Sequence, residues 1–207
     1  EQLRSGALAG TRRLDLSCGL TELPEEVFAL ADTLEVLNLS GNRLRELPHQ
    51  LSRLHKLQVL FASDNDFEVL PEVLGDCPAL QMVGFKANRI TLVPAAALPP
   101  SLRWLTLTDN AIDHLPTELG QRPALQKLML AGNRLTALPD GLQTAQRQCG
   151  PHLLGRSLTC GAETQFHDYG TLCLQRSGQP IPNDEMRRQS RPRAWHGPVR
   201  PSTASAC

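Results

Sequence analysis

A pattern of leucines recurs along the first two-thirds of the chain. In single letters it reads L-x-x-L-x-L-x-x-N-x-L-x-x-L-P, at intervals of 22 or 23 residues. Five clear copies begin at Leu34, Leu57, Leu80, Leu102 and Leu125. A degenerate copy begins near Thr11. A repeat of this length is typical of solenoids, in which each coil buries its apolar side chains against its neighbours.

Each part of the pattern predicts a local structure. The segment L-x-x-L-x-L alternates with period two, which indicates a short strand whose leucines face the core. The proline that follows fixes φ, and the apolar spacing after it, as in "HQLSRL", favours a short helical turn. We therefore expect parallel strands on a concave face, with turns or short helices on the convex face.

The ninth position of every clear copy is an asparagine. Its amide can donate and accept hydrogen bonds at once. Stacked one per coil, such amides can satisfy backbone groups that turn inward where the chain leaves the strand. The residues are Asn42, Asn65, Asn88, Asn110 and Asn133.

Taken together, the repeats resemble the 23-residue type of leucine-rich repeat. The resemblance implies a structural asparagine ladder and an α/β repeat fold, a solenoid of about six coils with a parallel concave sheet. Past the repeats no period persists, and we expect a poorly structured C-terminal tail. We expect an N-terminal cap helix over residues 1–10, the repeat domain over 11–144, and an irregular or disordered tail over 145–207.

The outward strand positions of the concave face are the third, fifth and seventh of each copy. They include a strip of Val, Phe, Met and Trp in a chain with only 4% aromatic residues, which favours a protein-binding surface. The candidate binding residues are Val36, Asn38, Val59, Phe61, Met82, Lys86, Trp104, Thr106, Lys127 and Met129. Two alternatives stay open. Strand propensity alone places such residues here, or another segment of the chain covers them.

The amino-acid sequence of the repeats is also similar to the N-terminal region of bacterial leucine-rich-repeat serine/threonine protein kinases. The stretches "RRLDLSCGLTELPEEVFALADTLEVLNLSGNRL" and "LGDCPALQMVGFKANRI" carry this resemblance. It implies a cytoplasmic signalling protein whose repeats recognise a protein partner. No Gly-rich loop, H-R-D or D-F-G motif occurs, so we expect no catalytic residue and no cofactor. The alternatives are a kinase family member that uses ATP, and an effector that acts through its tail.

Composition narrows the range of partners. Formal net charge is zero, which argues against nucleic acid, and no apolar run reaches the length of a membrane span. The six cysteines show no C-x-x-C spacing, so we expect no metal site and reduced thiols.

The pattern stops near Ala145. A next copy needs leucines at positions 148, 151 and 153, where the chain has Gln148, Pro151 and Leu153. This favours a frameshift or truncation, with an evolved C-terminal cap as the alternative. If the sixth coil is uncapped, it exposes an open hydrophobic end and favours end-to-end self-association. The leucines at that end are Leu125, Leu128, Leu130 and Leu135.

Overall fold

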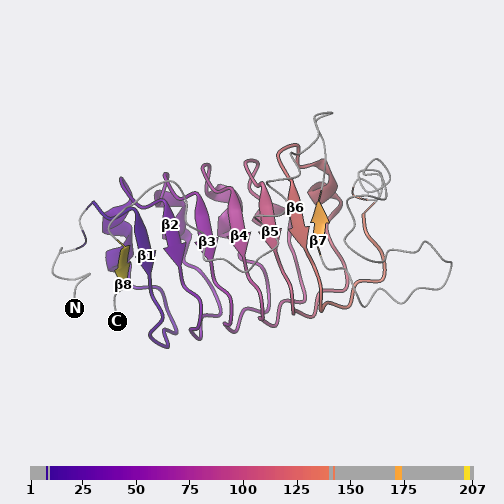
Figure 1. Cartoon of the computed structure of the whole chain (residues 1–207), viewed down its shortest axis with the longest axis horizontal. Coiled ribbons are helices and arrows are strands. Elements are labelled where there is room, and N and C mark those ends of the chain that lie inside the picture. Colours follow the sequence, from indigo (N-terminus) through magenta and orange to yellow (C-terminus); the bar gives the residue numbers. More distant parts are fainter. Residues whose placement is uncertain (1–7, 9, 140–141, 143–170, 174–202, 206–207) are drawn as a thin grey trace, which may run out of the picture.

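The computed structural model describes residues 8, 10–139, 142, 171–173 and 203–205. One three-residue strand from each of six coils joins a single parallel sheet (Figure 1). The strands are β1 (Arg13–Asp15), β2 (Val36–Asn38), β3 (Val59–Phe61), β4 (Met82–Gly84), β5 (Trp104–Thr106) and β6 (Lys127–Met129). Each strand covers the third to fifth positions of its repeat, and equivalent positions pair across the whole sheet.

Short 3-10 helices lie on the other side of the coils, behind the strands in Figure 1. They are η1 (Glu25–Leu30), η2 (His49–Arg53), η3 (Glu72–Asp76), η4 (Ala95–Ala97) and η5 (Thr117–Gln121). Each helix begins after a proline in an extended conformation, as at Pro48 with φ −70°. The carbonyl of that proline accepts a bond from the third residue after it, as in Leu51 N to Pro48 O at 3.0 Å. The predicted helical turns are thus confirmed, in the tighter 3-10 form.

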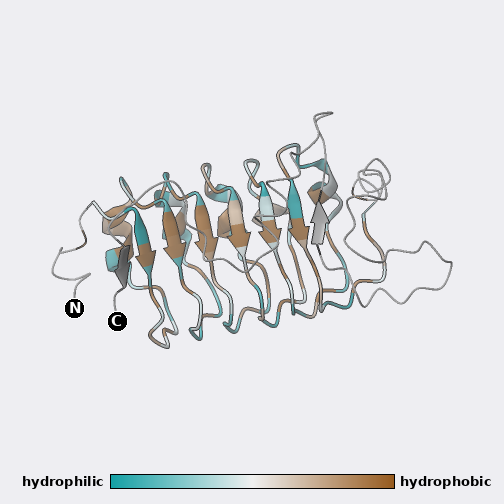
Figure 2. Ribbon diagram, viewed as in Figure 1, coloured by the Kyte–Doolittle hydropathy of each residue, from teal (hydrophilic) through white to brown (hydrophobic). Residues whose placement is uncertain are grey.

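The core runs between these two layers. At the fourth repeat position, the middle of each strand, every side chain is at most 3% exposed. These residues are Leu14, Leu37, Leu60, Val83, Leu105 and Leu128. Two phenylalanines replace leucines of the pattern in the middle of the stack. The Phe67 and Phe85 rings are fully buried and meet edge to face, with centroids 5.0 Å apart at 77°. Figure 2 shows hydrophobic residues in brown along β3, beside hydrophilic residues in teal in β1 and β6.

Gly75 marks a close approach between two neighbouring coils. It lies in η3, and a Cβ built on it would overlap the backbone oxygen of Ala96 in η4. The obstacle is backbone rather than the end of a flexible side chain, so the two helices would have to move apart. Glycine is therefore required where the small alanines of η4 allow the chains to come this near.

We expect Gly75→Ala to lower the free energy of unfolding by about 1–3 kcal/mol, the usual cost of overpacking a well-filled site. Chemical denaturation followed by circular dichroism measures this loss. Gly19→Ala is a poor control because φ is +68° there, whereas Ala96→Gly removes the methyl group but leaves the carbonyl in place. Relief of the Gly75→Ala loss by Ala96→Gly would contradict a clash with backbone.

Two further strands belong to the region after residue 144. Strand β7 (Thr171–Cys173) pairs antiparallel with β6, and β8 (Thr203–Ser205) pairs parallel with β1. The sheet therefore has eight strands in the order β7-β6-β5-β4-β3-β2-β1-β8. Apart from residues 8 and 10, which are in a turn, the predicted cap helix lies outside the described residues, as does the rest of the predicted tail. Those domain boundaries therefore stay predictions.

Two expectations about the ends of the repeat array are wrong. The four leucines of the sixth coil are at most 4% exposed, so they do not border an open hydrophobic end. Cys18 takes part in a disulfide, so not every thiol is reduced.

Candidate functional site

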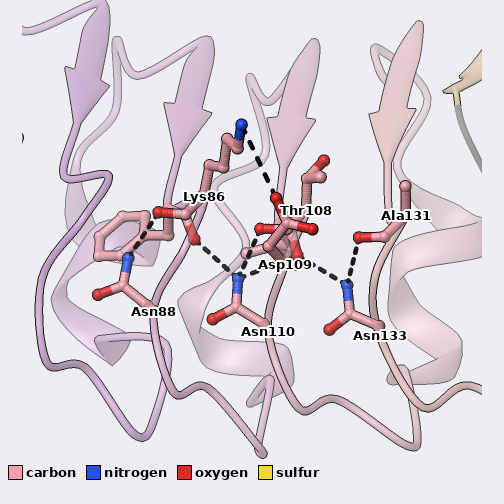
Figure 3. Close-up of polar contacts among 9 residues, drawn as sticks. Lys86, Asn88, Thr108, Asp109, Asn110, Ala131 and Asn133 are labelled. Atoms are coloured by element: carbon pink, nitrogen blue, oxygen red, sulfur yellow. Dashed lines mark hydrogen bonds and ion pairs between the residues drawn. The ribbon is translucent and has the colours of Figure 1, made fainter.

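The asparagines at the ninth position connect each coil to the one before it. Asn65 illustrates the pattern: its Oδ1 accepts from Leu44 N at 3.0 Å, and its Nδ2 donates to Leu39 O at 2.9 Å and Ser63 O at 3.0 Å. Equivalent amides bond in the same way at Asn42, Asn88, Asn110 and Asn133. Figure 3 shows the last three stacked one per coil. These bonds satisfy buried backbone groups that water does not reach. Because each amide bonds to the coil before it, the bonds also fix the offset between coils.

A fixed offset keeps equivalent outward side chains in line across the sheet. We call the face that they form the open face, and we call Val36, Val59, Phe61, Met82, Trp104 and Met129 the apolar strip. The Cα atoms of Val59, Met82 and Trp104 are successive partners across β3, β4 and β5. Most of the strip is half-buried, and Val59 is only 7% exposed. The strip is thus a continuous, partly accessible row rather than a set of scattered side chains.

The position of Phe61 in the strip depends on Gly84 in the neighbouring coil. A Cβ built on Gly84 would lie 2.7 Å from Cδ1 of the Phe61 ring, so the ring covers the glycine backbone. These two residues are Cα partners in β3 and β4. Glycine at this position lets the phenylalanine lie against the sheet and leaves Met82 beside it on the same face.

Polar side chains border the strip at its β1 end. Arg13 Nε donates to Asp15 Oδ2 at 2.9 Å, and Asn38 Nδ2 donates to Asp15 Oδ1 at 2.9 Å. Burial alone would raise the pKa of the Asp15 carboxyl, but the bonds from Arg13 and Asn38 outweigh it and lower that pKa. Asp15 therefore stays ionised at neutral pH, and its charge is matched by Arg13.

The β6 end of the strip combines a cation with apolar groups. Lys127 Nζ lies 5.2 Å from the centroid of the Trp104 ring, within the range of a cation–π contact. Thr106 Oγ1 lies 3.6 Å from Met129 Sδ, to which it donates. The ammonium group is thus held beside the largest side chain of the strip.

Lys86 lies two residues beyond the end of β4, at the next outward position and at the rim of the open face. Its Nζ is 3.7 Å from Asp109 Oδ2 (Figure 3). Both side chains are more than half exposed, so this ion pair adds little stability. All ten candidate binding residues are therefore on or beside one face, with Lys86 at its edge.

The described residues show little that could do covalent chemistry. No group of three or more His, Cys, Asp or Glu side chains among them could hold a metal ion. Burial, together with the nearby Asp76 charge, raises the pKa of the Cys77 thiol to about 11. That thiol is protonated at neutral pH and is a poor nucleophile. None of the described helices has the length and apolar run needed to cross a membrane.

One exposed apolar pair was not predicted from the sequence. Val69 and Leu92 are 41% and 56% exposed, and they form an isolated parallel bridge between adjacent coils outside the main sheet. Both residues immediately precede the apolar residue and proline that all copies of the repeat share. The other copies have Glu22, Glu46, His114 and Ala137 at this position, which is the signal that could have identified the pair.

Comparison with known proteins agrees with this architecture. Residues 9–67 match the family model described as leucine rich repeat. The chain is 46% identical over 59 residues to leucine-rich repeat-containing protein 7 of Rattus norvegicus, which covers 28% of this chain and 4% of that protein. The chain therefore spans only a small part of the curated relatives that it matches.

Two solved structures extend the likeness to most of the coils. A leucine-rich-repeat protein of Leptospira interrogans is 32% identical with a TM-score of 0.61, over 70% of this chain and 37% of that one. The plant peptide hormone receptor RGFR1, in complex with RGF2, is 29% identical with a TM-score of 0.54, over 63% of this chain and 22% of that one. With one strand per coil, an asparagine in each clear copy and a leucine core, the chain has the leucine-rich-repeat solenoid fold.

Proposed function

We propose that this chain is a protein-interaction scaffold that binds its partner on the open face. The single observation that carries the proposal is the apolar strip, which crosses five coils in line and includes Trp104 and two methionines. Trp and Met are enriched in the buried centres of protein interfaces. Methionine also adapts to irregular partner surfaces because its side chain is unbranched and flexible.

The scaffold itself supports this use. The ladder and the leucine core hold the strip on a stack of short strands, so little ordering of the surface is needed when a partner binds. The structurally similar RGFR1 is described as a peptide hormone receptor in complex with RGF2. By analogy, the open face of this chain offers a partner an extended row of side-chain contacts.

The finer form of the proposal is that the repeats are the recognition part of a bacterial signalling kinase and act without catalysis of their own. It is supported by the resemblance of the repeat sequences to those of bacterial leucine-rich-repeat kinases and by the likeness to a Leptospira protein. A cytoplasmic location stays a prediction. End-to-end self-association lacks support now that the leucines of the sixth coil are buried.

The proposal is tested by placing charge in the strip. We expect Met82→Asp combined with Trp104→Asp to weaken partner binding at least tenfold, because each carboxylate would have to be desolvated in the interface. The probe is a set of peptides selected from a random display library against the full chain. Dissociation constants for these peptides are measured by calorimetry, after circular dichroism has shown that the variant is folded.

The matched control is Val69→Asp combined with Leu92→Asp. It makes the same chemical change at exposed apolar residues of adjacent coils, away from the open face. Selected peptides should bind this control as tightly as the unchanged chain. If the control loses binding and the strip variant does not, the interface lies on the exposed pair and the proposal is wrong.

A further inference from the structure

The cations beside the open face are neutralised at its β1 end. Arg12 Nη1 is 3.6 Å from Glu35 Oε1, and Arg13 Nε is 2.9 Å from Asp15 Oδ2. Each arginine therefore has a carboxylate of its own. A partner carboxylate arriving at this end would have to compete with Glu35 or Asp15 and would be repelled by them.

The β6 end differs at equivalent repeat positions. Arg103 occupies the second position, like Arg12, but its Nη2 donates to the neutral Gln126 Oε1 at 3.2 Å. Lys127 occupies the third position and lies over the Trp104 ring instead of beside an acid. Within the described part of the chain, no carboxylate lies within 4.0 Å of either cation. Two positive charges are thus uncompensated where the strip has its largest side chain.

These two cations come from adjacent coils, and both are neighbours of Trp104, one along the chain and one across the sheet. Arg103 directly precedes Trp104 in the chain, and Lys127 is the Cα partner of Trp104 in the next strand. On the other side, Met82 is the Cα partner of Trp104 in β4. An apolar surface therefore passes into a positive one within three neighbouring strands.

From this arrangement we infer that the open face binds a peptide segment in which a carboxylate side chain stands next to large apolar side chains. The carboxylate meets Lys127 and Arg103, and the apolar side chains lie on Trp104 and Met82. This inference rests on the proposed function and adds the chemical class of the partner and its direction along the strip.

The charge of the repeat region as a whole works against such a ligand. Acidic side chains outnumber basic ones over residues 1–144, so the long-range field repels an acidic peptide. Among the described residues, the attraction for a carboxylate at this end of the strip comes from the local cations Lys127 and Arg103. The double variant at these two residues therefore measures their share of any acidic enrichment.

The test uses the same library selection on the full chain. We expect selected peptides to be enriched in Asp or Glu adjacent to Leu, Phe, Trp or Met. For these peptides, Arg103→Gln combined with Lys127→Gln should raise the dissociation constant about tenfold, as two partly exposed ion pairs are lost. Raising the salt concentration should weaken binding to the unchanged chain more than binding to this variant.

The matched control is Arg12→Gln combined with Arg45→Gln, which removes two positive charges from exposed residues away from Trp104. It should leave affinity for the selected peptides unchanged. Peptides that need Trp104 and Met82 but show no acidic preference would overturn this inference and leave the proposed function standing. Peptides that are indifferent to Trp104 and Met82 would overturn both.

Discussion

Replacing Phe67 by alanine is expected to lower the free energy of unfolding by about 3–5 kcal/mol. The side chain is fully buried, and its ring lies edge to face with Phe85 in the next coil. Removing the ring leaves a cavity between two central coils, which relax only partly because the ladder fixes their offset. In a solenoid, stability depends on contacts between neighbouring coils, so this substitution weakens an interface in the middle of the stack.

Urea denaturation followed by circular dichroism measures this effect. The graded control is Phe67→Leu, because other copies have leucine or isoleucine at this position, as at Leu44 and Ile90. It should be clearly less harmful than alanine, since most of the volume is kept. Equal losses for alanine and leucine would show that the volume of the side chain is not what matters at this site and would contradict the cavity account.

Replacing Asn65 by alanine is expected to cost about 2–4 kcal/mol. The amide is 7% exposed and makes three hydrogen bonds to backbone groups. Alanine leaves Leu44 N without a partner, and a buried orphan group costs about 1–3 kcal/mol. Leu39 O loses one of its two bonds and still accepts from Asn42 Nδ2 at 2.7 Å. We expect Asn65→Asp to be no better, because a carboxylate accepts from Leu44 N but cannot donate to Leu39 O.

The matched control for the ladder is Asn38→Ala. Asn38 lies on the open face, is half-buried and donates to the Asp15 carboxylate. Its loss should cost no more than about 1 kcal/mol, because water can replace much of the bond. If thermal unfolding shows the same loss for Asn38→Ala and Asn65→Ala, the ladder does not have the structural role assigned to it.

The repeat pattern predicted the parts of the fold that each coil determines by itself. Leucine alternation predicted the strands, and each proline predicted the turn that follows it. The alternation of side chains along each strand predicted which of them point outward and share the open face. These features depend on local spacing, and spacing is visible in a single sequence.

Features that depend on the neighbouring coil could not be predicted in this way. In the sequence, Gly84 is an outward strand position without a side chain. In the structure, the Phe61 ring lies against its backbone. Gly75 appears as a helix-weakening residue, yet Ala96 of the next coil makes it necessary. Ala87 adopts a left-handed φ of +52° at the eighth position, where Gly41 and Gly132 do so easily. In each case the cause is a contact or a turn imposed by the stack.

The central claim is that partners bind on the apolar strip, and Trp104 offers a direct measurement of it. The chain has two tryptophans, so Trp195→Phe leaves Trp104 as the only indole. A selected peptide is titrated into this variant while its emission is recorded. We predict a saturable change in the Trp104 emission, with the dissociation constant found by calorimetry. Binding by calorimetry without any change in that emission would contradict the claim.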